Sequence, residues 1–198
     1  MVLPAPARSK RLATMTVMAL AVAAAIALLA SLRSDLAYFT QSDTAVALGE
    51  ATEVDPAALT SNAYVSVSGS PMASRTVEYS RLFGGTYAVF PLAGQRRVFV
   101  QVAADDPVRA RQASRREFSG RLVTMAELGG RYASVRQHYE SIGVPVTGET
   151  FVVLADEPPG SYGWAVGLAV LCLLFALINL LLLLRWFRPI RIEREITA

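Results

Sequence analysis

Histidine and cysteine, the side chains that most often carry acid–base chemistry or bind transition metals, each occur once in this chain of 198 residues. His138 stands beside the apolar face of a predicted helix, where a histidine is usually structural. Cys172 lies inside a long apolar stretch, which excludes Cys-based zinc sites, C-x-x-C redox pairs and disulfides. We therefore predict no catalytic residue, no metal ligand and no bound cofactor.

Two pairs of neighbouring acids are the other candidates for chemistry, Asp105-Asp106 and Asp156-Glu157. Adjacent carboxylates can help to bind a hard cation, but a calcium loop also needs spaced oxygen ligands and a glycine turn that neither pair has. The second pair runs into Pro158-Pro159-Gly160, a stiff connector. We interpret both pairs as solvated loop acids.

Arginines gather between the two acidic pairs. Arginine binds carboxylate and phosphate through two parallel hydrogen bonds, so this cluster could contact an acidic partner or a lipid headgroup. Alternatively it is a solvated loop balanced by the neighbouring Asp105, Asp106 and Glu117. The arginines proposed for the partner or headgroup contact are Arg109, Arg111, Arg115 and Arg116, and Arg121 follows them.

Two uncharged apolar stretches flank the middle of the chain, at residues 12–32 and 162–184. A transmembrane helix needs about 20 predominantly apolar residues, which both stretches supply. Tyr162, Trp164 and Trp186 flank the second stretch, as expected of aromatic rings at the headgroup level. The first stretch could instead be a cleaved secretory signal, but it is longer than an ordinary signal core and we favour an uncleaved anchor.

Basic residues near the ends of the two stretches predict the orientation. Residues 1–11 and 185–198 place seven basic residues next to the outer ends of the stretches, whereas Arg33 is the only one next to an inner end. By the positive-inside rule both termini face the cytoplasm, and residues 33–161 form an extracytoplasmic domain at an inner membrane. The basic residues counted are Arg8, Lys10, Arg11, Arg185, Arg188, Arg191 and Arg194.

Small residues recur on both predicted transmembrane helices. At a spacing of four they allow helix backbones to approach closely, and an asparagine can hydrogen-bond across such an interface. Either the stripe joins the two helices to each other, or it binds another membrane subunit. The predicted helix-packing residues are Ala19, Ala23, Ala27 and Ser31 in the first helix, and Gly163, Gly167 and Asn179 in the second.

The central domain has a strand pattern followed by a helix pattern. From Ala63 onward, apolar residues alternate with mostly polar ones. The turn Gly84-Gly85 separates expected strands at 75–83 and 86–92, and Ala93-Gly94-Gln95 makes the next reversal, which predicts an antiparallel meander of about four strands. The alternating residues are Val65, Val67, Val77, Tyr79, Val98, Val100 and Val102. Two further strands are expected at 117–123 and 150–154. Between them an apolar stripe predicts one amphipathic helix, capped by Thr124 and Glu127 and ended by Gly143. The stripe consists of Leu128, Tyr132, Val135, Tyr139 and Ile142.

These patterns predict an α+β fold: two transmembrane helices around a mostly antiparallel β domain, which could close into a partial barrel of the OB kind. A domain nearly neutral in charge gives no sign of nucleic-acid binding. Neither apolar stretch contains an ionisable residue, which excludes a proton pump or ion transporter built from these helices alone.

We expect a non-enzymatic accessory protein, an assembly factor or subunit of a larger membrane complex. In layout alone it is similar to Surf1-type oxidase assembly factors, which also place a mostly β domain between two terminal helices, although none of that family's motifs is present. An extracytoplasmic ligand-binding sensor is the alternative. A membrane-tethered hydrolase that uses His138 or an acidic pair is a remote one, since no supported nucleophile is evident.

Overall fold

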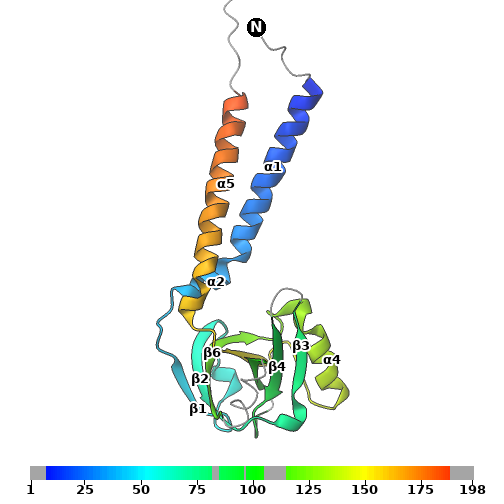
Figure 1. Ribbon diagram of the computed structural model, residues 1–198, viewed down its shortest axis with the longest axis vertical. Helices are drawn as coiled ribbons and strands as arrows, with labels where there is room; N and C mark the ends of the chain where they lie inside the picture. The colour runs from blue at the N-terminus through cyan, green and yellow to red at the C-terminus, as the bar shows by residue number, and fades with distance from the viewer. Residues whose placement is uncertain (1–7, 82–84, 96, 105–114, 188–198) are drawn as a thin grey trace, which may run out of the picture. The chain divides into compact units, whose positions relative to one another are not determined.

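A computed structural model describes residues 8–81, 85–95, 97–104 and 115–187 (Figure 1). Its contacts divide the chain into two compact units, which we describe separately. One unit comprises Met1–Leu36 and Gly163–Ala198, and the other comprises Ala37–Tyr162.

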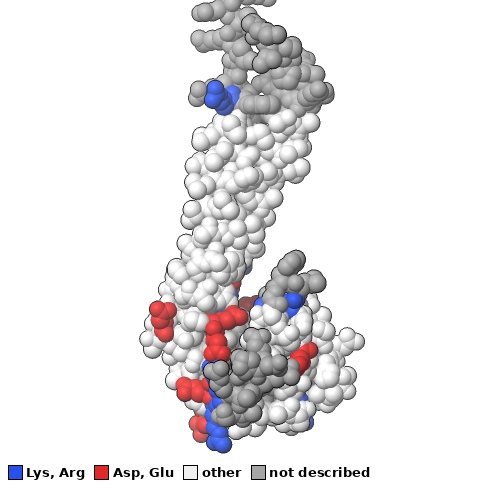
Figure 2. Space-filling model, in the orientation of Figure 1, with Lys and Arg blue, Asp and Glu red and all other residues white. Residues whose placement is uncertain are grey.

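The first unit contains the helices α1 (Arg8–Ser31) and α5 (Gly163–Phe187), and the short helix α2 (Arg33–Phe39) follows α1. Leu12–Ser31 has a mean hydropathy of 2.4 and Pro159–Arg185 one of 2.9, so both are long and apolar enough to cross a membrane. On the face shown in Figure 2, a basic side chain lies at the upper end of the helices, the helical surface below it is uncharged, and other charged side chains gather on the β domain.

The two long helices contact each other through a stripe of small residues on α5. Ala165, Ala169 and Cys172 follow one another at helical spacing and are buried. Ala25 is buried on α1, and Leu32, which directly follows this helix, is buried as well. The small side chains of Ala165 and Ala169 thus pack against Leu32, and small residues at a helix interface allow the two backbones to approach closely.

The second unit is built on one mixed sheet of seven strands in the order β1-β2-β6-β7-β5-β4-β3. The central strand β7 is buried throughout and entirely apolar, as expected of a strand covered on both faces. The strands are β1 (Val46–Glu50), β2 (Ala63–Ser68), β3 (Val77–Ser80), β4 (Thr86–Pro91), β5 (Val98–Ala103), β6 (Glu117–Thr124) and β7 (Phe151–Ala155).

The predicted α+β class is confirmed, but the predicted four-strand meander is wrong in part. Of the strands assigned to the meander, β3, β4 and β5 do pair antiparallel in succession. Strand β2 pairs instead with β6, and β5 lies parallel to β7. The edge strand β1, which pairs parallel with β2, was not predicted because its sequence Val-Ala-Leu-Gly-Glu has no clear alternation.

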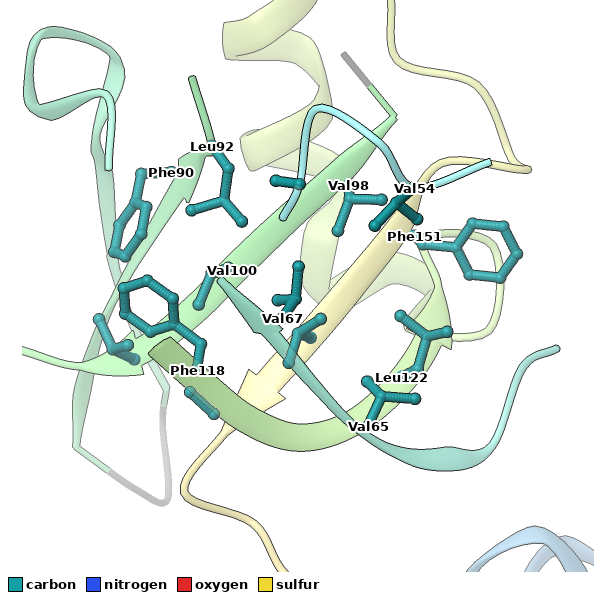
Figure 3. Close-up of a cluster of buried hydrophobic side chains, with 14 of the residues drawn as sticks. Val54, Val65, Val67, Phe90, Leu92, Val98, Val100, Phe118, Leu122 and Phe151 are labelled. Atoms are coloured by element: carbon teal, nitrogen blue, oxygen red, sulfur yellow. The ribbon is translucent and has the colours of Figure 1, made fainter. Parts of the chain in front are cut away.

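The sheet curls strongly around one of its faces. Phe90 on β4 and Phe118 on β6 are separated by two strands, yet their ring centroids are 5.7 Å apart (Figure 3). Flat neighbouring strands would lie about 4.8 Å apart each, so only curvature brings these rings together. A bridge between Pro71, which follows β2, and Leu92, which follows β4, also draws these two segments together.

Gly120 on β6 permits the close approach to β7. A Cβ atom at this position would lie 1.9 Å from the backbone oxygen of Leu154, which no side chain could tolerate. Glycine in the interior of a strand commonly marks such a bend or close backbone contact.

The other face of the sheet is covered by α4 (Ala133–Ser141) and the preceding 3-10 turn η3 (Gly129–Tyr132) (Figure 1). Tyr132, Val135 and Tyr139 are buried as predicted, whereas Ile142 is 45% exposed. The regular helix has ended before Ile142, so this residue leaves the apolar stripe. Gly143 follows with φ 72°, the left-handed conformation that ends many helices.

Candidate functional site

Polar side chains interrupt the buried face of the sheet beneath α4 at two positions, Gln101 on β5 and Arg121 on β6. In the register of the sheet both are opposite Leu154 of β7, one on each side. Gln101 is 2% exposed and Arg121 6% exposed. Because burying polar groups is costly unless they are paired, each is the centre of a cluster of tyrosines that we describe in turn.

The Arg121 cluster consists of Arg121, Tyr38, Tyr162, Asn62 and Glu157. The guanidinium lies 4.8 Å from the ring centroid of Tyr38 and 4.7 Å from that of Tyr162, and Nε donates to Oδ1 of Asn62 at 2.8 Å. The two rings meet edge to face with centroids 5.0 Å apart. Aromatic faces attract a desolvated cation by roughly 2 kcal/mol.

The two tyrosines of this cluster are fixed through their hydroxyl groups to Glu157. Tyr38 donates to its backbone oxygen at 2.7 Å, and Tyr162 donates to its Oε2 at 2.5 Å. Burial raises the pKa of the Tyr38 phenol, so this hydroxyl remains a neutral donor. Tyr38 and Tyr162 are the second and the last residues of the β unit Ala37–Tyr162. Through its contacts with both rings, Arg121 therefore links the start of this unit to its end.

The Arg81 cluster consists of Arg81, Tyr79, Tyr87, Gln101 and Tyr132. The Arg81 guanidinium lies 4.1 Å from the ring centroid of Tyr87. The rings of Tyr79 and Tyr87, which are opposite each other on β3 and β4, are stacked at 5.8 Å. Tyr132 meets Tyr79 edge to face at 5.3 Å.

Gln101 Oε1 is the shared acceptor of the Arg81 cluster. It accepts from the Tyr79 hydroxyl at 2.6 Å, from the Tyr132 hydroxyl and, at 3.4 Å, from Nη2 of Arg81. Nη2 also donates to the Tyr79 oxygen at 3.2 Å. Burial raises the pKa of Tyr132, so its hydroxyl keeps its proton. The cluster therefore offers hydrogen-bond donors and a positive charge, which suits binding of an acceptor better than proton abstraction.

The arginines proposed from the sequence lie in different surroundings. Arg115 forms two hydrogen bonds to Asp156, at 2.8 and 2.9 Å, and donates through Nε to the Glu117 backbone oxygen. Arg116 is exposed. The other two proposed contacts, Arg109 and Arg111, lie outside the described residues, as do Asp105 and Asp106.

Both acids of the second pair have partners within the domain: Asp156 is exposed, as expected of a loop acid, and binds Arg115, whereas the half-buried Glu157 accepts from Tyr162. Tyr162 is accordingly buried, not an interfacial ring, while Trp164 is 54% exposed. His138 is exposed on α4, with its ring next to that of Tyr139. Within the described ranges, His, Cys, Asp and Glu residues form no group of three that could hold a metal ion.

The predicted helix-packing stripe of α1 does not face α5. Its four members are exposed, whereas the buried Ala25 lies on another side of the helix. On α5, Gly163 and Asn179 are half-buried and Gly167 is exposed. Asn179 donates to the backbone oxygen of Phe175 within its own helix at 2.9 Å. The exposed α1 residues are Ala19, Ala23, Ala27 and Ser31.

Comparison of the chain with models of known families, with curated proteins and with solved structures gives no match.

Neither tyrosine cluster was proposed as a site from the sequence. The sequence did contain one signal, at Gln101. In β5, Val98, Val100 and Val102 form one face, while Phe99 and Gln101 lie on the other. The uninterrupted apolar strand β7 next to it indicates that both faces are covered, and a glutamine on a covered face requires partners. The tyrosines that supply them, Tyr79 and Tyr132, come from two separate segments, which no local pattern connects.

Proposed function

We propose that this chain is a two-pass inner-membrane protein with both termini in the cytoplasm and the β domain outside it. The proposal combines the two apolar helices with the distribution of basic residues. Seven Lys or Arg residues flank the outer ends of the apolar stretches, against Arg33 at the inner ends.

We further infer that the β domain is a partial barrel of the OB kind. Strands β2 and β3 follow each other along the chain but lie at opposite ends of the order β2-β6-β7-β5-β4-β3. They are therefore arranged like the two halves of one long strand that bends between the two ends of the sheet. The bridge from Pro71 to Leu92 and the contact between Phe90 and Phe118 support closure of this curl. The parallel pairing of β5 with β7 is also the arrangement of an OB barrel.

Within this architecture, the function we propose is that of a non-enzymatic accessory protein, an assembly factor or subunit of a larger membrane complex. The observation that carries the proposal is the exposed small-residue stripe of α1. At 100° per residue, Ala23 and Ala27 lie on the side opposite to Ala25 and Leu32. The stripe is therefore not used by the contact between α1 and α5, and it suits close packing against a helix of another subunit.

The test enlarges the stripe and asks whether a membrane partner is lost. The double substitution Ala23→Leu with Ala27→Leu adds bulk where close packing is proposed. The matched control, Val170→Leu with Leu174→Phe, adds bulk on exposed positions of α5. Each tagged variant is purified from native membranes in mild detergent, and co-purifying proteins are quantified by mass spectrometry.

We expect a stoichiometric membrane partner with the unmodified chain and the control, and loss of that partner by at least about tenfold when the stripe is enlarged, which corresponds to about 1.4 kcal/mol. Purification of the unmodified chain alone or as a homo-oligomer would sink the proposal. So would equal recovery of the partner by all three proteins.

A further inference from the structure

We propose that the Arg81 cluster is a binding site for an oxyanion, the carboxylate or phosphate group of a ligand reached from solvent. This inference goes beyond the accessory role and does not depend on it. It rests on four features of Arg81, Tyr79, Tyr87, Gln101 and Tyr132: hydrogen-bond supply, charge, rigidity and exposure.

The cluster contains more hydrogen-bond donors than acceptors. The Nε atom of Arg81 is buried and has no acceptor among the described residues. A buried donor left unpaired costs about 1–3 kcal/mol, and such groups are rare in folded proteins. Within the cluster, Gln101 Oε1 is already shared by three donors, although a carbonyl oxygen has two lone pairs. Its contact with Arg81, at 3.4 Å, is long for a hydrogen bond.

The positive charge of Arg81 has no carboxylate partner among the described residues. Among the described residues, Arg115 pairs with Asp156 and Arg136 with Glu140, so these two carboxylates are engaged elsewhere. Glu157, on the same side of the sheet, is engaged by the Tyr162 hydroxyl. A carboxylate or phosphate would supply both the missing negative charge and the missing acceptor atoms.

Aromatic packing holds the guanidinium in place without neutralising it. Tyr87 lies beneath it at 4.1 Å, and Tyr79 both stacks on Tyr87 and donates to Gln101. A ligand would thus meet a positioned guanidinium, which reduces the entropy lost on binding. The hydroxyl protons of Tyr79 and Tyr132 are already donated to Gln101, so the donors left for a ligand are those of the guanidinium.

The cluster is open to solvent on one side. Arg81, Tyr79 and Tyr87 are half-buried, whereas Gln101 and Tyr132 lie underneath and are buried. A ligand would therefore approach from the Arg81 side. The same oxyanion chemistry could be presented by a free anion or by an anionic lipid headgroup, and the experiment separates these two sources.

The experiment is a titration of the full chain followed by NMR of the arginine Nε–Hε groups, which reports directly on the unpaired donor. Arg81→Lys assigns the Arg81 signal and keeps the charge while it removes the planar fork of donors. Inorganic phosphate and acetate are the free-anion probes, added to the protein in neutral detergent. Nanodiscs of phosphatidylglycerol, compared with nanodiscs of phosphatidylcholine, are the headgroup probes.

We expect the Arg81 signal to shift in a saturable manner, with a dissociation constant of about 1 mM or below for at least one probe. By isothermal calorimetry, Arg81→Lys should weaken binding about tenfold or more, because the paired hydrogen bonds are lost. Tyr87→Leu, which leaves Arg81 in place but removes its aromatic support, should weaken binding as well and serves if the lysine variant does not fold. Arg116→Lys, at an exposed arginine, is the control that should bind normally.

A response to free anions identifies a soluble ligand, and a response to phosphatidylglycerol alone identifies the headgroup; either outcome supports the proposal. Absence of any shift with all probes would overturn it. An equal, non-saturating shift of the Arg81 and Arg116 signals would also overturn it, because that pattern reports general charge screening.

Discussion

Arg121 is a buried cation held by two tyrosine rings and an amide oxygen, and its removal should be costly. Arg121→Met fills much of the same volume but leaves Oδ1 of Asn62 without this donor and both rings without the cation. We expect the free energy of unfolding to fall by about 2–3 kcal/mol. Denaturant unfolding in detergent, followed by the near-ultraviolet circular dichroism of the tyrosines, measures the change. Arg116→Met is the exposed control, and an equal effect of both substitutions would contradict the account.

Glu127 links the turn before η3 to a neighbouring loop. Burial alone would raise its pKa, but hydrogen bonds from the Ser61 hydroxyl and the Thr124 backbone outweigh burial and lower the pKa of this carboxyl. A lowered pKa in the folded state means that the ionised form stabilises the fold at neutral pH. This contribution is complete above the ordinary value of 4.5 and is lost as the pH falls toward the folded value.

Glu127→Gln should therefore destabilise the domain at pH 7 by up to about 1 kcal/mol. The difference from the unmodified chain should shrink as the pH drops below 4.5, where the native carboxyl also becomes neutral. Unfolding curves at pH 7, 5 and about 3.5 test this sign. A difference that stays constant over this range would show that the charge of Glu127 is unimportant.

At the scale of single elements, β6 depends on the absence of a side chain at position 120. Gly120→Ala would place a methyl group against the backbone oxygen of Leu154, which cannot move without disturbing β7. We expect a loss of about 3 kcal/mol in the free energy of unfolding. Gly148→Ala is a matched control, because its added methyl would meet only the Cβ atom of Ala126 at 3.5 Å. Equal melting temperatures of the two variants would argue against the close approach.

The contact between α1 and α5 predicts how the single cysteine reacts. Cys172 is buried on the α5 stripe, whereas Ala27 is exposed on α1. In detergent, a maleimide should label native Cys172 at least about tenfold more slowly than a cysteine introduced by Ala27→Cys in a Cys172→Ala background. Similar rates at both positions would indicate that this surface of α5 is open.

Local patterns in the sequence predicted single elements well where the signal itself was local. The positive φ of Gly94 and of Gly143 agrees with the turn and the helix end predicted at these residues. Strand pairing was less predictable, because the partner of β2 is 49 or more residues away and depends on how the whole sheet curls. The Arg81 and Arg121 clusters could not be predicted for the same reason.

At the scale of the whole molecule, the proposed orientation can be tested with an introduced cysteine. Arg116→Cys, in the Cys172→Ala background, places a thiol on an exposed position of the β domain. Because the basic residues favour a cytoplasmic location of both termini, we expect a membrane-impermeant maleimide to label this cysteine in cells with a permeabilised outer membrane. A cysteine added after Ala198 should be labelled only after the inner membrane is lysed. The reverse result would reject the orientation.

The Arg121 cluster also has a consequence for how such a chain could have been assembled. Tyr38 and Tyr162 are 124 positions apart, yet their rings touch, so the β domain begins and ends at nearly the same point. A domain with adjoining ends can be inserted into a loop, or removed from it, at little cost in chain entropy. The β domain can thus be regarded as an insertion in the connection between α1 and α5. Replacement of residues 37–162 by a short glycine–serine linker should leave a helical hairpin in which α1 still packs against α5.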